Sequence, residues 1–317
     1  MPRALESYKL YASTYPRDAN ALNNLGSTYQ TAGDFEHAAT SFVKTWEAAK
    51  WDNAAATNAA QAFLALDRLS DAERYQKESL QEGAGENPSY HSNSVIYGFL
   101  AGCTDWGNEV QWAEPRPGGF QVEGVVGDVN FFTGKAHLAG QHWEHSGQRA
   151  IQQHLPDAAG SFYALKAVHA AFVSDCATAR SAAHRGLSVD RSDATMPNAA
   201  LALALCGETG PAVQEMERLT SAEPANTLVN EVYLPQVKAA AALRQHHPEQ
   251  VSELLTSVAP YLLVSKASQL LGLASLETNR WQQAIADFAP GLRGIVVSAL
   301  RKELLGIRKP PTTPCAS

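Results

Sequence analysis

Several protein classes are excluded by what this sequence lacks. No run approaches about 18 uncharged apolar residues, so we predict no membrane span in this chain. Basic side chains are outnumbered, 25 against 32 acidic ones, and the net charge is −7 at pH 7. Since proteins that bind nucleic acid usually present a basic face, we predict no nucleic-acid partner. An apolar content of 45% is ordinary for a folded protein and excludes a disordered chain.

Cysteine is scarce and forms no motif. The four cysteines, Cys103, Cys176, Cys206 and Cys315, are far apart and make no CxxC pair. A chain of 317 residues needs no disulfide framework, so we predict free structural thiols in a reducing compartment. Cys176 stands at an apolar position, where we expect a small core residue. With no signal peptide in the sequence, these features favour the cytoplasm.

No catalytic motif is complete. The chain lacks the GxGxxGxV loop, the Val-Ala-Ile-Lys segment and the His-Arg-Asp and Asp-Phe-Gly motifs with which protein kinases hold ATP and magnesium. Gly127 and Gly134 have the spacing of a phosphate-binding loop, but Lys135 is followed by Ala136 instead of Ser or Thr. No GxSxG motif frames a serine. We therefore predict no enzyme activity, no catalytic residue and no cofactor.

Histidines gather in residues 137–145 without the spacing of a helical zinc site. An HExxH site needs two histidines four apart, whereas His137, His142 and His145 are separated by five and three residues. We expect these side chains to be solvated and predict no metal site. The alternative is that His142 and His145 share a helix face and capture a metal ion.

A repeat with a period of 34 dominates the sequence. Residues of one kind recur 34 positions apart, in the pairs Tyr29 and Phe63, Phe35 and Leu69, and Ala38 and Ala72. A fixed period in this range indicates a solenoid of small helical units. The first unit also resembles a tetratricopeptide repeat residue by residue, through Leu25, Gly26, Tyr29, Gly33, Phe35, Ala38 and Phe42.

Physical chemistry supports helix pairs at these positions. Leu22, Leu25, Gly26 and Tyr29 share one helix face, and the Gly33-Asp34 pair breaks the chain before the next helix. Later units keep the spacing with more variation: they are marked by Gly127, Gly134, Ala139 and Trp143, then by Gly207, Ala212, Met216 and Pro224, and last by Gly272, Trp281, Ala284 and Phe288. We predict an all-α tetratricopeptide superhelix of about eight helix-turn-helix units.

The predicted organisation has four parts. Residues 1–114 form a first repeat array that starts in mid-repeat, 115–119 a Pro/Gly break, 120–298 a degenerate second array, and 299–317 a basic, Pro-rich disordered tail. Weaker signs predict helix pairs over 167–183 and 234–255 and a loop over 156–160. The orphan first helix lacks a polar cap and would leave Leu10 and Tyr11 uncovered, so it predicts self-association, or a chain that is part of a longer protein.

Several segments resemble one bacterial family. Residues 4–8, 15–18 and 23–26, with 233–235, 239–243, 259–261 and 293–296, are similar to the C-terminal repeat region of serine/threonine protein kinases of the acidobacterial type. The resemblance implies a regulatory or docking region without its kinase domain. Similar repeat regions also follow winged-helix regulators. If the parent kinase carries a membrane span before the repeats, the resemblance implies the extracytoplasmic side.

A concave groove is the candidate binding surface that the resemblance implies. On the Leu-Gly phasing, the inward positions of two successive units are Asn20, Asn23, Ser27, Gln30, Thr57, Gln61 and Leu64. Their amides can hydrogen-bond the backbone of an extended peptide, so we predict a protein or peptide partner. The absence of Lys and Arg from these positions argues against a chaperone-tail clamp. One alternative is that these side chains are merely solvated. Another is a small-ligand sensor with a pocket at Phe131, Phe132 and Trp143.

Overall fold

The computed structural model describes residues 2–50, 53–82, 86–262 and 265–292. All regular structure in these ranges is helical, which confirms the predicted all-α class. The chain divides between Trp112 and Ala113 into two compact units, called here the first and the second unit. The predicted tail, residues 299–317, lies outside the described residues.

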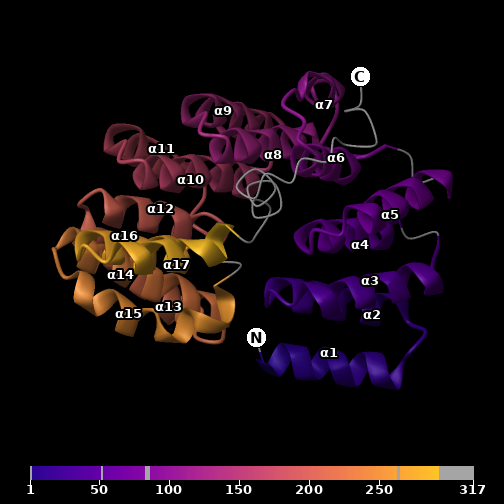
Figure 1. Ribbon diagram of the computed structural model, residues 1–317, viewed down its shortest axis with the longest axis horizontal. Coiled ribbons are helices and arrows are strands. Elements are labelled where there is room, and N and C mark those ends of the chain that lie inside the picture. Colours follow the sequence, from indigo (N-terminus) through magenta and orange to yellow (C-terminus); the bar gives the residue numbers. More distant parts are fainter. Residues whose placement is uncertain (1, 51–52, 83–85, 263–264, 293–317) are drawn as a thin grey trace. The chain divides into compact units, whose positions relative to one another are not determined.

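The first unit stacks helices in antiparallel pairs after a single leading helix. Figure 1 shows α1, then α2 with α3, then α4 with α5, in successive layers. The helices are α1 (Pro2–Thr14), α2 (Ala19–Thr31), α3 (Phe35–Ala48), α4 (Asn53–Ala65), α5 (Leu69–Gln81), α6 (Pro88–Ala101) and α7 (Gly107–Ala113).

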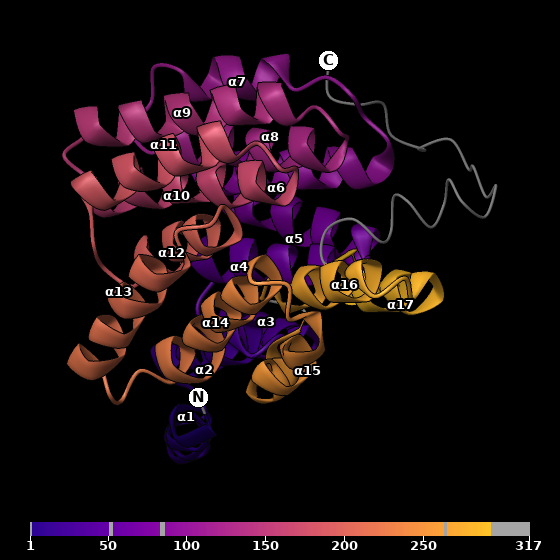
Figure 2. The ribbon, with the colours of Figure 1, turned by 90° about the vertical axis from the view of Figure 1, so that its left-hand side faces the viewer.

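The second unit continues the pairing. Figure 2 shows α10 beside α11 and α16 beside α17, and these neighbours are in contact. The helices are α8 (Gly119–Phe132), α9 (Ala136–Gln152), α10 (Pro156–Phe172), α11 (Cys176–Val189), α12 (Met196–Leu205), α13 (Thr209–Ala222), α14 (Leu234–Arg244), α15 (Val251–Leu254), α16 (Ala267–Glu277) and α17 (Trp281–Leu292). A π-helical turn, Val229–Tyr233, precedes α14, and the 3-10 turns Pro248–Gln250 and Thr256–Tyr261 flank α15.

Short acidic or amide side chains start many of these helices. The Asp18 carboxylate accepts from the backbone N–H groups of Asn20 and Ala21 at 2.9 and 3.3 Å, and Asp34 accepts from His37 N–H at 3.2 Å. Each bond satisfies a donor that has no partner within the helix. The sequence therefore sets the starts of α2 and α3 locally, whereas α5, α9 and α10 begin without a side-chain cap.

Left-handed backbone closes most of the helices. Gly33, Gly102, Gly134 and Gly207 have φ between 79° and 98°, and each follows the end of a helix. Five other residues take the same conformation, with φ between 56° and 64°, although they carry a Cβ: Asp67, His154, Ser174, His246 and Asn279. This conformation ends a helix by turning the chain back, as the return to the partner helix requires.

Residues 156–160 were expected to form a loop, and this prediction is wrong. Pro156 is the first residue of α10, a 17-residue helix. Proline is favourable there because the first helical N–H has no intrahelical acceptor and the proline ring already holds the required φ. The helix pair predicted over 167–183 is accordingly longer, since α10 and α11 together run from Pro156 to Val189.

The prediction of free thiols is also wrong. Cys176 and Cys206 form a disulfide with a Cα–Cα distance of 5.3 Å, which joins the start of α11 to the end of α12. Cys103 is disulfide-bonded as well, and no cysteine in the described part of the chain is free. The prediction failed because the spacing of 30 residues in sequence says nothing about two helix ends that meet in space. Cys176 is half-buried at the disulfide rather than a core residue.

Candidate functional site

A row of side-chain amides crosses the helices of the first unit. On α2 and α4, Asn58 donates from Nδ2 to Asn23 Oδ1 at 3.2 Å, and Gln30 donates from Nε2 to Gln61 Oε1 at 3.2 Å. On α6, Asn93 donates from Nδ2 to the carbonyl of Thr57 at 3.1 Å. These five amide side chains, Asn23, Gln30, Asn58, Gln61 and Asn93, are called the amide row. They connect successive helices that each come first in their pair.

The predicted groove residues differ in their exposure. Asn20, Ser27 and Gln61 are exposed, and Asn23 and Gln30 are partly exposed. Thr57 and Leu64 are only 6% and 3% exposed, so neither side chain can meet a partner, and their assignment to the binding surface is wrong. Both lie on α4, an alanine-rich helix that is buried on more than one side. A periodic pattern finds the packed face, but it does not show how far burial extends around the helix.

Asn58 and Asn93 belong to the row but were missing from the prediction. Asn23, Asn58 and Asn93 are spaced 35 residues apart along the sequence. That step differs by one residue from the period of 34 and could have found them.

The contact between the helices of a pair repeats throughout the chain. A Cβ placed on Gly26 would lie 2.7 Å from Phe42 Cε1, and one placed on Gly127 would lie 2.7 Å from Trp143 Nε1. Gly272 meets Phe288 in the same way. In all three pairs the aromatic residue follows the glycine by 16 positions. A small residue on one helix thus admits a large ring from the next.

This is tetratricopeptide-repeat packing. In the described residues it is built from eight successive pairs, α2–α3 to α16–α17, in agreement with the predicted number of units.

Three solved structures of repeat proteins are similar to this chain. No family model and no curated protein matches the chain. A tetratricopeptide repeat protein from Parabacteroides merdae ATCC 43184 is 13% identical, over 91% of this chain and 97% of that one, with a TM-score of 0.37. YrrB, a TPR protein with an unusual peptide-binding site, is 12% identical over 90% and 100% (TM-score 0.26). The TPR domain of P58(IPK) is 14% identical over 96% and 94% (TM-score 0.28).

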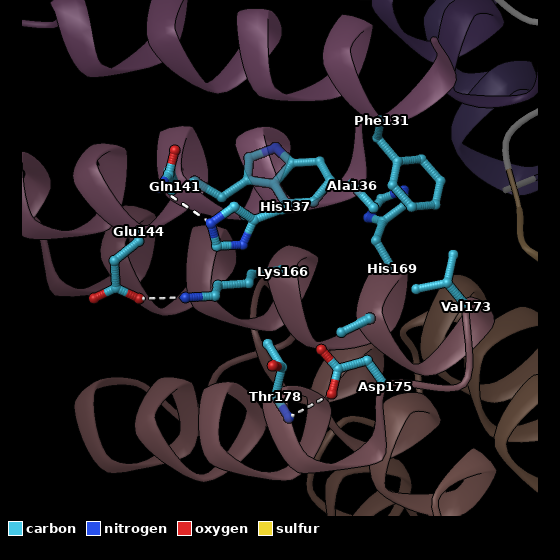
Figure 3. A pocket seen from close by; sticks show the side chains of 13 residues that line it. Phe131, Ala136, His137, Gln141, Glu144, Lys166, His169, Val173, Asp175 and Thr178 are labelled. Atoms are coloured by element: carbon cyan, nitrogen blue, oxygen red, sulfur yellow. Dashed lines mark hydrogen bonds and ion pairs between the residues drawn. The ribbon is translucent and has the colours of Figure 1, made fainter. Parts of the chain in front are cut away.

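A pocket of about 310 Å³ opens in the second unit between α9, α10 and α11 (Figure 3). Its lining combines an aromatic end with charged side chains: Phe131, Ala136, His137, Gly140, Gln141, Trp143, Glu144, Lys166, His169, Ala170, Val173, Asp175 and Thr178. Of the three aromatic residues expected at a pocket, Phe131 and Trp143 are present, whereas Phe132 is not part of the lining.

Three rings form the aromatic end of this pocket. The centroid of His169 lies 4.7 Å from that of Trp143 in a stacked arrangement and 4.3 Å from that of Phe131. Burial lowers the pKa of His169 to about 3, and the positive charge of Lys266 adds to this effect. The imidazole is therefore neutral at pH 7. Its Nδ1 lies 2.9 Å from the carbonyl of Leu165, which can only accept, so Nδ1 carries the proton and Nε2 is an acceptor.

The charged side of the pocket is organised around Glu144. Lys166 donates from Nζ to Glu144 Oε2 at 2.9 Å, and Arg185 forms a second ion pair with the same carboxylate. Burial raises the pKa of Glu144, but the two cations outweigh burial and lower it overall. Figure 3 shows Lys166 turned toward Glu144, away from the aromatic end.

The expectation that His142 and His145 are solvated is wrong for His142, whose side chain is 19% exposed, whereas that of His145 is 42% exposed. Their Nδ1 atoms lie 3.4 and 2.7 Å from Oε1 of Glu123, whose side chain is almost fully buried. Glu114, Glu123 and His145 could together offer ligand atoms to a metal ion. However, Arg149 Nη1 lies 3.5 Å from Glu123 Oε2, so a cation there would face a guanidinium. The cluster is better described as a hydrogen-bonded network around the buried Glu123 carboxylate.

In the described ranges, no helix combines the length and the apolar character that crossing a bilayer requires.

Proposed function

We propose that this protein is a non-catalytic interaction module whose first unit binds an extended peptide segment along the amide row. The observation that carries the proposal is the pair of amide-to-amide bonds between α2 and α4, from Asn58 to Asn23 and from Gln30 to Gln61, whose side chains are exposed or partly exposed. Asn93 is 3% exposed and supports α4 through the Thr57 carbonyl. Each amide has both a donor and an acceptor, as a peptide bond does, so a peptide backbone can replace the amide-to-amide bonds one for one. Exposed Asn20 and Ser27 extend the polar surface beside the row.

A displayed library of random 12-residue peptides tests this proposal. We expect the purified protein to enrich peptides, and the double variant Asn23→Ala/Asn58→Ala to bind them at least about tenfold more weakly, which corresponds to about 1.4 kcal/mol. Asn24→Ala is the matched control, since Asn24 is an exposed amide on the same helix outside the row. Equal binding by the double variant and the control would remove the row from the site.

We further propose that the module regulates a bacterial serine/threonine kinase carried on the same parent protein or docked to it. The support is the likeness of segments such as residues 4–8 and 23–26 to the repeat regions of those kinases. In-frame kinase motifs encoded upstream of these repeats would support this parentage. A DNA-binding winged-helix domain at that place would assign the module to a transcription regulator instead.

A second candidate function is small-ligand sensing by the pocket of the second unit. Its volume of about 310 Å³ and its combination of stacked rings with a Lys–Glu pair favour a small ligand that has an apolar and a polar end. In a thermal-shift screen with a fragment library, a true ligand should raise the melting temperature of the protein. Phe131→Ala should abolish the shift, whereas Phe132→Ala, its neighbour outside the lining, should preserve it.

The disulfides argue for an oxidising compartment, in place of the cytoplasm favoured by the sequence. Disulfides persist outside the reducing cytoplasm, and Cys176–Cys206 joins two helix ends. We propose that the protein folds on the extracytoplasmic side. Alkylation of intact cells followed by mass spectrometry should find Cys176 and Cys206 unlabelled; labelled thiols at both positions would return the protein to a reducing compartment.

Self-association through α1 is also proposed. Leu10 on this helix and Tyr15 just after it are 69% and 57% exposed, which is unusual for large apolar side chains. Light scattering should show a concentration-dependent mass that Leu10→Lys abolishes. A constant monomer mass for the unmodified protein would exclude this contact.

A further inference from the structure

The pocket between α9, α10 and α11 contains a hydrogen-bond acceptor for which the protein supplies no donor. His169 lines the pocket, is 8% exposed, and donates from Nδ1 to the carbonyl of Leu165 at 2.9 Å. Its Nε2 is therefore the acceptor, and among the described residues no hydrogen-bond donor contacts it. A largely buried acceptor without a donor is unfavourable, so its place in a pocket wall favours a ligand that brings a donor.

The side-chain donors nearest to this end of the pocket are directed elsewhere. Trp143 is stacked on the imidazole of His169, but its Nε1 donates to Asp128 Oδ1 at 3.0 Å. Lys166 lines the pocket too, and its Nζ donates to Glu144 Oε2 at 2.9 Å. Neither donor can serve His169 without giving up its own hydrogen bond.

The surroundings of this acceptor are apolar. Figure 3 shows His169 at the end of the pocket where Phe131, Ala136 and Val173 lie. The ring centroids of Phe131 and His169 are 4.3 Å apart, whereas Trp143 is only 1% exposed and supports the imidazole from behind. Aromatic rings pack well against such ring faces and edges. A volume of about 310 Å³ is at the lower end of the range for ligand pockets, so one or two rings fill it.

The charges around the pocket favour a neutral ligand. The carboxylate of Glu144 is already paired with Lys166 and Arg185. Burial lowers the pKa of His169 to about 3, and the positive charge of Lys266 adds to this effect. The same positive charge disfavours an ammonium group at the aromatic end. A carboxylate, in turn, has no proton to donate to the neutral imidazole.

We propose that this pocket binds a neutral aromatic ring that carries an N–H or O–H group, and that His169 Nε2 accepts the hydrogen bond from that group. The ring itself packs against Phe131. Indoles and phenols are the simplest members of this class. This inference rests on the second candidate function, small-ligand sensing by the second unit, and it names the class of ligand. No residue of the amide row takes part.

Two pairs of small molecules test the proposal. Indole and benzofuran have the same shape, but benzofuran has a ring oxygen in place of the N–H group. Phenol and fluorobenzene differ in the same way, because fluorine replaces the hydroxyl. We expect the unmodified protein to bind the donor-bearing member of at least one pair about tenfold more tightly, as measured by ligand-observed NMR titration. The pair with the larger ratio shows whether nitrogen or oxygen carries the donor.

Variants assign this preference to one side chain. His169→Phe keeps a ring against Trp143 but removes the acceptor, so it should bind the two members of each pair equally. His184→Phe is the matched control, since His184 is an exposed histidine of α11 outside the lining, and it should keep the preference. Circular dichroism confirms that both variants are folded. A further readout needs no variant: the ¹⁵N NMR signal of His169 Nε2 should shift when indole is added and stay in place when benzofuran is added.

The outcomes separate this inference from the candidate function on which it rests. Equal binding of both members of both pairs by the unmodified protein overturns the inference, and so does a preference that His169→Phe retains. If none of the four molecules binds while other fragments raise the melting temperature, the inference fails alone. If no fragment binds at all, small-ligand sensing fails with it.

Discussion

Asp128 is a residue whose ionisation works against folding at neutral pH. Burial raises its pKa from 3.8 to about 6, and this increase remains after the opposing effects of the Trp143 hydrogen bond and the Lys266 charge. The folded state therefore binds the proton more tightly than the unfolded state. Its contribution to stability is fully present below pH 3.8 and is lost as the pH rises through about 6.

Replacement of Asp128 by Asn should therefore stabilise the protein at neutral pH. Trp143 Nε1 donates to Asp128 Oδ1 at 3.0 Å. The uncharged asparagine can accept the same hydrogen bond through its own Oδ1. We expect the free energy of unfolding to rise by about 1–2 kcal/mol at pH 7.5, after a discount for partial exposure, and to change little at pH 3.5. Urea denaturation at the two pH values measures this. Exposed Glu277→Gln is the control, and a loss of stability at pH 7.5 would contradict the argument.

At Gly127 the packing leaves room only for the hydrogen atom of a glycine and not for a methyl group. A Cβ at this position would lie 2.7 Å from Trp143 Nε1, and Trp143 is almost fully buried and cannot move away. We expect Gly127→Ala to cost about 2 kcal/mol of unfolding free energy. In Gly140→Ala the nearest atom, Lys166 Cε, is 3.7 Å away, so that change should gain up to about 1 kcal/mol from helix propensity. Thermal denaturation distinguishes the two signs.

Among the helices, α9 has the additional role of holding the connection that precedes α8. Arg149 donates from Nη2 to the carbonyls of Ala113, Glu114 and Arg116 at 2.8, 2.9 and 3.2 Å. Gln153 accepts from the N–H of Gly118 at 3.0 Å. The Pro/Gly segment expected as a break is thus tied to a helix that lies 33 to 36 residues later in the sequence.

Loss of the Arg149 guanidinium should loosen this connection. Arg149→Met removes three hydrogen bonds to carbonyl groups and leaves Glu123 with only its histidine partners. We therefore expect the free energy of unfolding to fall by about 3 kcal/mol. The double variant Arg149→Met/Glu123→Gln should recover part of the loss, because no unpaired buried charge remains. Arg218→Met, whose arginine is exposed, should change the unfolding free energy by less than about 1 kcal/mol. A small effect of Arg149→Met in chemical denaturation would show that the three contacts contribute little.

The sequence predicts whole elements better than it predicts their polar contacts. The 16-residue step from Gly26 to Phe42 recurs at later pairs, so the helix pairs were accessible from periodicity alone. The Arg149 contacts and the Cys176–Cys206 disulfide were not, because both join residues at helix ends whose separation follows from three-dimensional stacking. Three of the five residues of the amide row were predicted for the same reason: Asn23, Gln30 and Gln61 follow the repeat, whereas Asn58 and Asn93 recur at a step of 35 residues.

At the scale of the molecule, the disulfide fixes one part of the second unit. The Cys176–Cys206 bond closes a loop with a sequence separation of 30 residues. A loop of this length should contribute about 2–4 kcal/mol by restricting the unfolded chain. Reduction with dithiothreitol, or the Cys176→Ser/Cys206→Ser variant, should lower the melting temperature by several degrees. The variant has no bond between these positions for dithiothreitol to reduce. An equal melting temperature of the unmodified protein with and without dithiothreitol would show that the disulfide does not stabilise the fold.

The left-handed turns also define a simple route to a more heat-resistant protein. His154 and His246 adopt φ of 59° and 63°, a conformation that costs a residue with a Cβ about 1–2 kcal/mol and costs glycine almost nothing. Neither histidine lines a pocket or belongs to the amide row. His154→Gly and His246→Gly should each raise the melting temperature by about 2–4 °C, after the entropy of the freer unfolded chain is subtracted. The equivalent turns after α2, α8 and α12 already have glycine, and the two substitutions would extend the same residue choice to the turns after α9 and α14.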